Sequence, residues 1–307
     1  MSRCRWAASV RKRSVPADSP WRCGASPRFS EIAERAAHRA PKAWIVNFTN
    51  PASIVTQGLH DAGFTNAVGI CDSSDTMARD AAAYLGLVSR DIRLRVFGLN
   101  HCSFAGEIIA GGEDVLPKLL ADDAFLDRFL GLYEKPLLRE LGALPNEYLY
   151  YYFSCDKAVG ALLAEKKTRG ELVKEMHDEF FRGARENGSV RPVAALFELH
   201  ESLLARRHKT YMDYAWKESK EGQRPKEKTE TDPEGYAGVA LDLIQGLSSA
   251  SPRRVVLNYR NGGALDAFAH HDIAELSYDV STDGIKPVAP PRVPERAREL
   301  FARVKLF

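Results

Sequence analysis

Three short apolar segments, each followed within four residues by a polar or thiol side chain, constrain the fold of residues 29–103 most strongly. The segments are 43–46, 66–70 and 92–97. Helical patterns lie between them, and strands that alternate with helices at this spacing are typical of βαβ units. The carboxyl ends of neighbouring parallel strands meet at one rim, where α/β proteins bind ligands. We therefore expect Asn50, Cys71 and His101 to converge on one rim.

A cysteine and a histidine at such a rim indicate a metal site. Thiolate and imidazole together suit a borderline divalent metal such as Mn, Fe, Co, Ni or Zn. Two protein ligands leave open positions for substrate and water, as a catalytic site requires. Cys71 also precedes a predicted helix over 75–85, and a helix N-terminus favours the thiolate.

A structural interpretation of the same residues stays open. No compact ligand motif such as C-x-x-C is present, so Cys71 and His101 fit equally a buried cysteine and an unrelated capping histidine. The segment around Asn50, N-F-T-N-P, also fits an ordinary strand-to-helix turn capped by Asn and Thr.

Five motifs resemble glycoside hydrolase family 4, in the family's order and at similar separations between about residues 30 and 290. They are N-F-T-N-P-A, G-I-C-D, G-L-N-H, L-P-N-E-Y-L-Y-Y-Y and N-Y-R-N-G-G-A. The resemblance implies an α/β fold: the remaining half of a Rossmann-like parallel sheet plus a mostly helical α+β second domain, as in lactate and malate dehydrogenases. It also implies NAD and Mn²⁺ or another divalent metal as cofactors.

The chemistry implied by the resemblance is a redox-assisted elimination, an exception to two-carboxylate glycoside hydrolysis. NAD removes hydride from C3 of the sugar, a base removes the C2 proton, and the leaving group departs from C1. Water then adds and the hydride returns, while the metal polarises the C2 and C3 oxygens. Residue by residue, Cys71 and His101 match the metal ligands, and Tyr148 matches the base. A phenol has an ordinary pKa of about 10, so this base needs positive charge nearby.

The resemblance assigns four further residues. Asp72 matches a carboxylate that protonates the leaving oxygen, Asn50 and Asn100 match substrate-binding amides, and Arg260 matches a segment on the active-site side of the second domain. Structural alternatives remain open here too. Tyr148 could belong to an aromatic core face, Asp72 could cap a helix, and Arg260 could be an exposed turn residue.

The chain departs from the family pattern at both ends. No G-x-G-x-x-G motif is present, so no residue is assigned to NAD. Residues 1–28 are rich in Arg, Ser and Pro, and we expect a disordered leader unrelated to the family. Residues 29–103 are predicted to form the partial Rossmann-like domain, and residues 104–307 a shortened second domain. We expect the chain to be truncated at both ends relative to the family.

Helical patterns dominate the second domain. They cover 117–141, 147–165, 168–185, 193–216, 235–247 and 294–304, and a strand is predicted over 254–259. The charged stretch 217–233 is predicted to be a solvated loop.

Composition limits the partners and the compartment. The formal net charge is +2 and no apolar run reaches about 18 residues, so neither nucleic acid nor a membrane is expected as a partner. The 5 cysteines are scattered and odd in number, which is typical of reduced thiols in the cytoplasm. A small phosphorylated sugar or glycoside is the expected ligand, and we expect a homo-oligomer.

The substrate predicted from these motifs is a 6-phospho-β-glucoside. The R-N-G-G run resembles the β-acting branch, whereas the Cys71-Asp72 pair favours the α-acting enzymes. A 6-phospho-α-glucosidase or α-galactosidase therefore stays open. From other classes, an inactive fragment that binds only metal or sugar and a 2-hydroxy-acid dehydrogenase also stay open.

Overall fold

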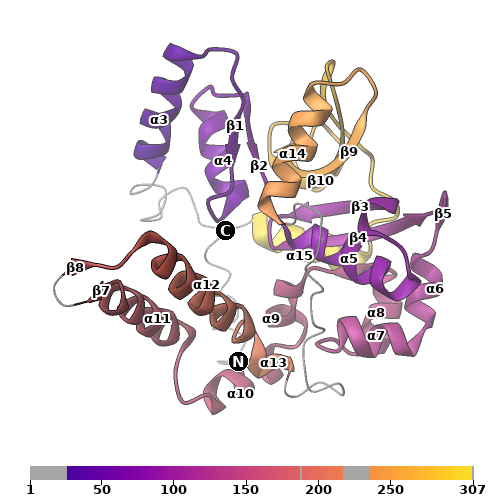
Figure 1. Cartoon of the computed structure of the whole chain (residues 1–307). Helices are drawn as coiled ribbons and strands as arrows, with labels where there is room; N and C mark the ends of the chain where they lie inside the picture. Colours follow the sequence, from indigo (N-terminus) through magenta and orange to yellow (C-terminus); the bar gives the residue numbers. More distant parts are fainter. Residues whose placement is uncertain (1–25, 187–188, 217–234, 306–307) are drawn as a thin grey trace.

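A computed structural model of the chain describes residues 26–186, 189–216 and 235–305 and shows an α/β protein built around two larger sheets (Figure 1). The first sheet has five strands in the order β1-β2-β9-β10-β11. These are β1 (Ile45–Asn47), β2 (Ala67–Gly69), β9 (Arg253–Arg260), β10 (Ile273–Ser281) and β11 (Gly284–Pro287). β1 and β2 run parallel, and antiparallel strands from the C-terminal part complete the sheet. The predicted α/β fold class is confirmed, with β1 and β2 as its parallel portion.

The second sheet corrects one prediction. Its strands are β3 (Ile92–Leu99), β4 (Cys102–Ala110), β5 (Glu113–Asp114) and β6 (Leu144–Pro145). β3 and β4 form an antiparallel hairpin in which Leu99 lies opposite Cys102. The prediction that β3 continues the parallel pair of β1 and β2 is therefore wrong, because β3 pairs with β4 in a separate sheet. The predicted domain boundary after residue 103 falls inside β4 of this hairpin.

Five helices belong to the part of the fold that holds the two sheets, and four of them contact strands directly. They are α3 (Ser26–Arg39), α4 (Ala52–Asp61), α5 (Ser73–Leu85), α14 (Tyr236–Leu247) and α15 (Glu295–Lys305), and a 3₁₀ turn, η1 (Ser89–Asp91), precedes β3. α4 contacts β2, β9 and β10, and α14 contacts β9 and β10, whereas α5 and α15 contact β3. The two sheets themselves meet where β10 packs on β3.

The remaining helices form the lower part of Figure 1. They are α6 (Leu116–Ala121), α7 (Asp123–Leu130), α8 (Lys135–Leu141), the 3₁₀ turn η2 (Glu147–Leu149), α9 (Tyr150–Phe153), α10 (Cys155–Ala164), α11 (Arg169–Gly183), α12 (Val193–Lys209) and α13 (Asp213–Trp216). A short ribbon of β7 (Arg185–Glu186) and β8 (Ser189–Val190) joins α11 to α12. The predicted helical pattern 117–141 is thus broken into three short helices.

One large hydrophobic core joins both sheets to α15. The ring of Phe97 on β3 stacks on that of Phe104 on β4 at 5.7 Å between centroids, and both meet the ring of Phe301. Leu276 and Tyr278 of β10 are fully buried in the same core. This shared core fixes the β3–β4 hairpin relative to the first sheet, and so fixes the side chains that follow β2 relative to the turn between β3 and β4.

Gly69 lets two elements approach the end of β2. A Cβ atom at this position would lie 2.8 Å from Cβ of Asn258 and 2.7 Å from Oγ1 of Thr56. Both distances are shorter than any ordinary carbon contact, so only glycine fits between β9 and α4 here. The close approach brings Asn258 to the level of the residues that follow β2.

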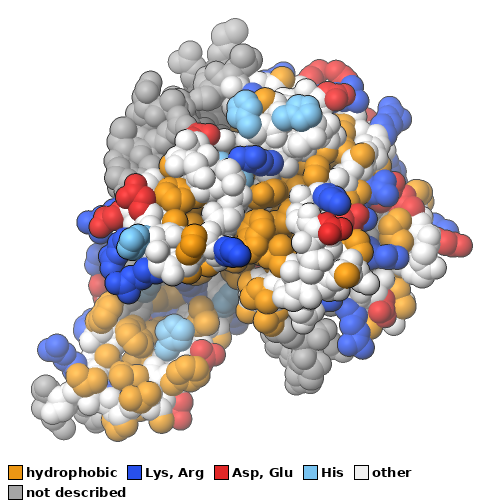
Figure 2. Space-filling model, turned by 90° about the horizontal axis from the view of Figure 1, so that it is seen from above, with side chains coloured by type: hydrophobic (Ala, Val, Ile, Leu, Met, Phe, Trp, Pro, Cys, Tyr) orange, Lys and Arg blue, Asp and Glu red, His pale blue; other side chains and the backbone are white. Residues whose placement is uncertain are grey.

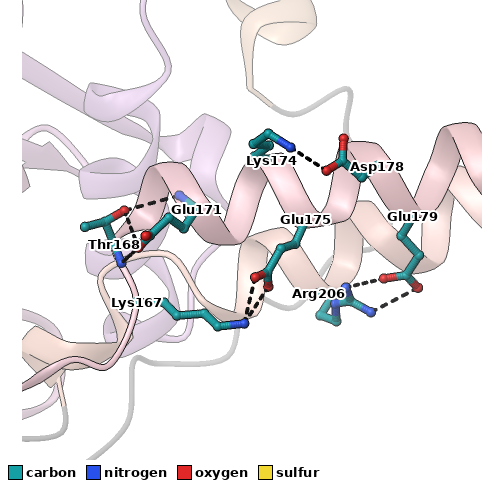
Figure 3. A network of polar contacts seen from close by, with 8 residues as sticks. All are labelled: Lys167, Thr168, Glu171, Lys174, Glu175, Asp178, Glu179 and Arg206. Carbon is teal, nitrogen blue, oxygen red and sulfur yellow. Dashed lines mark hydrogen bonds and ion pairs between the residues drawn. The ribbon is translucent and has the colours of Figure 1, made fainter.

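α11 and α12 form a hairpin that projects at the lower left of Figure 1. Its polar side is held by ion pairs and by a capping box of Thr168 and Glu171 (Figure 3). At its end, large apolar side chains are exposed, and the projecting lobe in Figure 2 carries hydrophobic side chains on its surface. The exposed residues are Phe181 (71%), Val190 (69%), Val193 (80%) and Phe197 (65%), hereafter the hairpin tip.

Two predictions concern residues that the structure does not describe. The loop 217–233 and all of the leader except residues 26–28 lie outside the described ranges, and residues 26–28 belong to α3. Among the helices that are described, none combines the length and the apolar character needed to cross a membrane.

Candidate active site

Cys71 lies directly after β2 and before α5, as predicted. Its side chain is buried, and its sulfur lies 3.3 Å from the hydroxyl oxygen of Ser73. Burial and, second, the nearby carboxylate of Glu275 raise the pKa of the Cys71 thiol to about 12. The expectation of a thiolate from the helix N-terminus is therefore wrong for the metal-free protein, because desolvation outweighs the helix dipole. A metal that binds Cys71 has to displace its proton.

His101 occupies the two-residue turn between β3 and β4 and has a left-handed backbone conformation, with φ of 62°. Its imidazole stacks on the ring of Tyr148, with 4.1 Å between centroids and 24° between planes. Burial lowers the pKa of His101 to about 4, so the imidazole is neutral at pH 7. Neutral imidazole is the form that binds metals.

The low pKa of His101 gives a testable pH dependence. The unfolded chain takes up this proton near pH 6.5, whereas the folded chain does so only near pH 4. The contribution of His101 to folding stability is therefore complete above about pH 6.5 and is lost as the pH falls towards 4. We expect the C2 proton of His101, assigned by its absence in His101→Gln, to titrate near pH 4 in NMR spectra of the metal-free chain. A midpoint near 6.5 would show that the imidazole is not desolvated.

Tyr148 lies in η2, where the side-chain oxygen of Asn146 accepts a hydrogen bond from the Tyr148 amide at 3.1 Å. Burial raises the pKa of the Tyr148 phenol well above its usual value, and a hydrogen bond with Tyr211 opposes this shift. Negative charge on Cys71 raises the same pKa further, so the phenol lies within electrostatic reach of the thiol. The imidazole of His101 therefore contacts this phenol, and charge on Cys71 acts on it electrostatically.

Two more predicted residues surround Tyr236 at this rim. The side-chain nitrogen of Asn50 donates to the Tyr236 hydroxyl at 3.4 Å. Asp72 occupies the N-cap position of α5, but its carboxylate makes no capping hydrogen bond. Burial raises the pKa of Tyr236, and the charges of Cys71 and Asp72 raise it as well. Asn50 therefore contacts this phenol, the charges of Cys71 and Asp72 act on it, and the Asp72 side chain does not cap α5.

Asn100 lies at the same turn as His101, but its amide is used within the protein. Its oxygen accepts a hydrogen bond from the Ala52 amide at 3.0 Å, and its nitrogen donates to Glu275 at 2.9 Å. These bonds indicate that Asn100 joins the segment after β1 to the β3–β4 turn. They do not support the predicted role as a substrate-binding amide.

Arg260 does not join the group. β9 runs antiparallel to β2 with Asn258 opposite Gly69, so Arg260 lies towards the amino end of β2. Its guanidinium donates to Nδ1 of His60 at 3.1 Å, and His60 in turn contacts the Ala67 carbonyl. The predicted place of Arg260 on the active-site side is wrong, because Cys71 follows the opposite end of β2.

Glu275 is the residue of the site that sequence reasoning missed. It is 1% exposed and accepts hydrogen bonds from Ser103 at 2.6 Å, Asn100 at 2.9 Å and Asn258 at 3.0 Å. Burial raises the pKa of its carboxyl group. An acidic residue within the apolar strand 273–278 was the available signal, because buried carboxylates are rare unless they have a specific set of partners.

The side chains at this site offer a divalent metal two candidate ligands. Among the described residues, no group of three or more His, Cys, Asp or Glu side chains could hold a metal. A site here would use the two predicted ligands, the Cys71 sulfur and the neutral His101 imidazole, and leave positions open for substrate and water. A cleft beside the site is lined by Ser73, Met77, Glu147 and Trp216.

The sequence matches two models of one protein family. The profile described as "Family 4 glycosyl hydrolase C-terminal domain" matches residues 96–307, and "Family 4 glycosyl hydrolase" matches residues 24–87. The chain belongs to glycoside hydrolase family 4. The first match alone covers more than half of the chain. The resemblance of the five motifs is therefore confirmed.

Relatives within family 4 include a 6-phospho-beta-glucosidase and a maltose-6'-phosphate glucosidase. The chain is 25% identical to the 6-phospho-beta-glucosidase of Escherichia coli over 271 residues, which cover 85% of this chain and 54% of that protein. It is 24% identical to the maltose-6'-phosphate glucosidase of Clostridium acetobutylicum over 295 residues, which cover 88% of this chain and 58% of that protein. The chain thus spans little more than half the length of these relatives.

Solved family 4 structures share the fold. The 6-phospho-beta glucosidase of Thermotoga maritima, solved with manganese, NAD⁺ and glucose-6-phosphate, has a TM-score of 0.63 at 20% identity. The match covers 92% of this chain and 60% of that one. A 6-phospho-alpha-glucosidase from gut microorganisms, solved with NAD and Mn²⁺, has a TM-score of 0.64 at 19% identity, covering 97% of this chain and 61% of that one.

Proposed function

We propose that this chain belongs to an enzyme that cleaves 6-phospho-β-glucosides by NAD-assisted elimination with a divalent metal. The observation that carries the proposal is the stacking of His101 on Tyr148, with Cys71 in electrostatic reach of the same phenol. Family membership supports the reaction class. The name of the E. coli relative and the glucose-6-phosphate bound to the T. maritima enzyme support a phosphorylated glucoside.

Tyr148 is the proposed base for the C2 proton of the sugar. A neutral phenol in this apolar setting is a poor base, so it requires a cation close by to be ionised. Cys71 and His101 are the proposed ligands that hold Mn²⁺ next to it. When bound, NAD supplies reversible oxidation at C3, and the metal polarises the C2 and C3 oxygens.

Asp72 is the proposed acid that gives a proton to the leaving oxygen as the C1–O bond breaks. Its carboxyl group makes no capping bond, so in its protonated form it is available for this task. Asn50 is the proposed substrate contact, because its side chain is exposed and has one long hydrogen bond. The rim after β1 and β2, where Asn50 lies, is also where this fold class binds nucleotides, although no Gly-rich phosphate turn is present in the sequence.

The test is a substrate panel with NAD, Mn²⁺ and a reductant. We expect turnover of 4-nitrophenyl 6-phospho-β-glucoside that requires both cofactors, and products formed in D₂O that carry deuterium at C2. Turnover of the 6-phospho-α-glucoside instead would select the α-acting alternative, which the Cys71-Asp72 pair favours. Turnover without deuterium at C2 would contradict elimination, and failure of NAD to bind in a titration of the folded chain would reject the proposed reaction for this chain.

We also infer that the chain forms a homo-oligomer through the hairpin tip. Apolar clusters of this kind mark interaction surfaces. Two copies packed symmetrically at the tip would bury four phenylalanines and four valines. At roughly 150–250 Å² for each fully exposed aromatic ring, these residues together bury on the order of 1,000 Å², near the lower limit for a specific interface.

The self-association prediction has a simple measurement. Light scattering after size exclusion is expected to show a dimer for the wild type and a monomer for the double variant Phe181→Ser, Phe197→Ser. Leu163→Ser is the control, since Leu163 is 81% exposed but lies on α10, outside the hairpin tip. A wild-type monomer, or a dimer that persists in the double variant, would contradict the inference.

The compartment that we propose is the cytoplasm. All three cysteines in the described part of the chain, Cys71, Cys102 and Cys155, are free thiols. Free thiols are typical of a reducing compartment.

A further inference from the structure

Glu275 is a buried carboxylate that the proposed reaction does not use. Its partners are three neutral donors, and no Lys or Arg of the described ranges forms an ion pair with it. Taking a carboxylic group out of water is costly unless hydrogen bonds compensate. The hydrogen bonds of Glu275 indicate which parts of the candidate site this carboxylate holds in place.

Two of the three donors flank His101. Asn100 precedes His101 and Ser103 follows it by two residues, and both side chains donate to the same carboxylate. Between them, His101 adopts a left-handed conformation, which is unfavourable for a residue other than glycine. Such a conformation persists only where neighbouring contacts fix it. The carboxylate of Glu275 ties down the turn on both sides of His101.

The third donor leads to the segment after β1. Asn258 donates to Glu275, and the side-chain oxygen of Asn258 accepts a hydrogen bond of 2.6 Å from the Ser53 hydroxyl. The Ser53 hydroxyl in turn accepts a hydrogen bond of 3.2 Å from the backbone N–H of Asn100. Glu275 thus links β9, β10, the start of α4 and the β3–β4 turn through one connected set of hydrogen bonds.

We propose that Glu275 is a positioning residue that holds the imidazole of His101 in the orientation in which it binds the metal. Glu275 acts through Asn100 and Ser103 and touches neither metal nor substrate. The proposal rests on the proposed function, in which His101 binds the cation. Partners that orient a metal ligand typically change metal affinity by about 10–100-fold when they are removed.

The experiment compares Glu275→Gln with Glu107→Gln in the full chain. Glutamine keeps the size of the side chain but points an amide N–H₂ at hydroxyl and amide donors. Glu107 is the control because it is a partly buried glutamate on β4 that lies away from the turn. Its carboxylate forms an ion pair with Arg95 at 3.0 Å. We expect the circular dichroism spectrum of Glu275→Gln to show a folded protein, and its Mn²⁺ affinity to be about 10–100-fold lower than that of the wild type. The Mn²⁺ affinity of Glu107→Gln is expected to be unchanged.

A second readout does not depend on the metal. The ring of Tyr148 shifts the NMR signal of the stacked His101 imidazole in the metal-free chain, and we expect this shift to change in Glu275→Gln but not in Glu107→Gln. If the wild type binds no Mn²⁺, the proposed metal site fails, while the NMR comparison still tests positioning. A folded Glu275→Gln with wild-type affinity and an unchanged His101 signal would overturn the inference.

Ser103→Ala covers the case in which Glu275→Gln does not fold. It removes one of the two anchors of the turn and leaves the carboxylate with two donors. We expect a smaller loss of Mn²⁺ affinity in the same direction and a change of the His101 signal. Unchanged affinity and an unchanged signal in a folded Ser103→Ala would contradict the positioning role.

Discussion

Replacing Tyr148 by phenylalanine is expected to lower turnover of 4-nitrophenyl 6-phospho-β-glucoside by about 10²–10⁴-fold, the range typical of a positioned acid–base group. Phenylalanine keeps the ring that stacks on His101 and removes only the phenolic oxygen. Without that oxygen, no group in the proposed mechanism accepts the C2 proton. The initial rate with saturating NAD and Mn²⁺ is the measurement.

Tyr151→Phe is the matched control for this loss. Tyr151 lies three residues further along, and its hydroxyl bonds to that of Tyr214. Its removal costs a partly buried hydrogen bond and touches no group of the proposed mechanism, so we expect turnover within a few-fold of wild type once the protein is folded. Mn²⁺ affinity is expected to be nearly unchanged in both variants. Tyr148→Phe that turns over as fast as Tyr151→Phe would rule out the phenol as the base.

Replacing either proposed ligand is expected to lower Mn²⁺ affinity by more than the ~10–100-fold that loss of an outer partner costs. Cys71→Ala removes the sulfur after β2, and His101→Ala removes the neutral imidazole at the β3–β4 turn. With two protein ligands, each loss leaves one. Electron paramagnetic resonance of free Mn²⁺ during a titration gives the affinity directly.

Cys102→Ala supplies the control thiol for these two variants. Cys102 neighbours His101 in sequence, but it begins β4 opposite Leu99. We expect its removal to leave Mn²⁺ affinity unchanged. Equal affinities in all three variants would mean that the metal binds elsewhere or not at all.

The fold was predictable where the signal is local. Helical periodicity located α5, α14 and α15 closely, because each helix buries one face against a sheet. The pairing of β3 was not predictable from its apolar run, since such a run is equally compatible with a parallel and an antiparallel neighbour. The turn at Asn100 and His101 also lacks the glycine that typically marks a two-residue hairpin.

The site shows the same division between local and distant information. Asn50 and Cys71 were placed correctly beyond strand ends, because each follows its own strand within three residues. Glu275 lies more than 170 residues from both Asn100 and Ser103, so no local pattern connects them. The protonation of the Cys71 thiol was also mispredicted, because it depends on burial and on the charge of Glu275, which only the assembled fold reveals.

Cobalt substitution tests most directly whether a thiol and an imidazole from separate segments bind one cation beside a phenol. A thiolate bound to Co²⁺ gives a charge-transfer absorption in the near ultraviolet. We predict this band in the wild type and in Cys102→Ala, its loss in Cys71→Ala, and a marked loss of Co²⁺ affinity in His101→Ala. A band that survives in Cys71→Ala, or no band in the wild type with Co²⁺ bound, would contradict the proposed metal site.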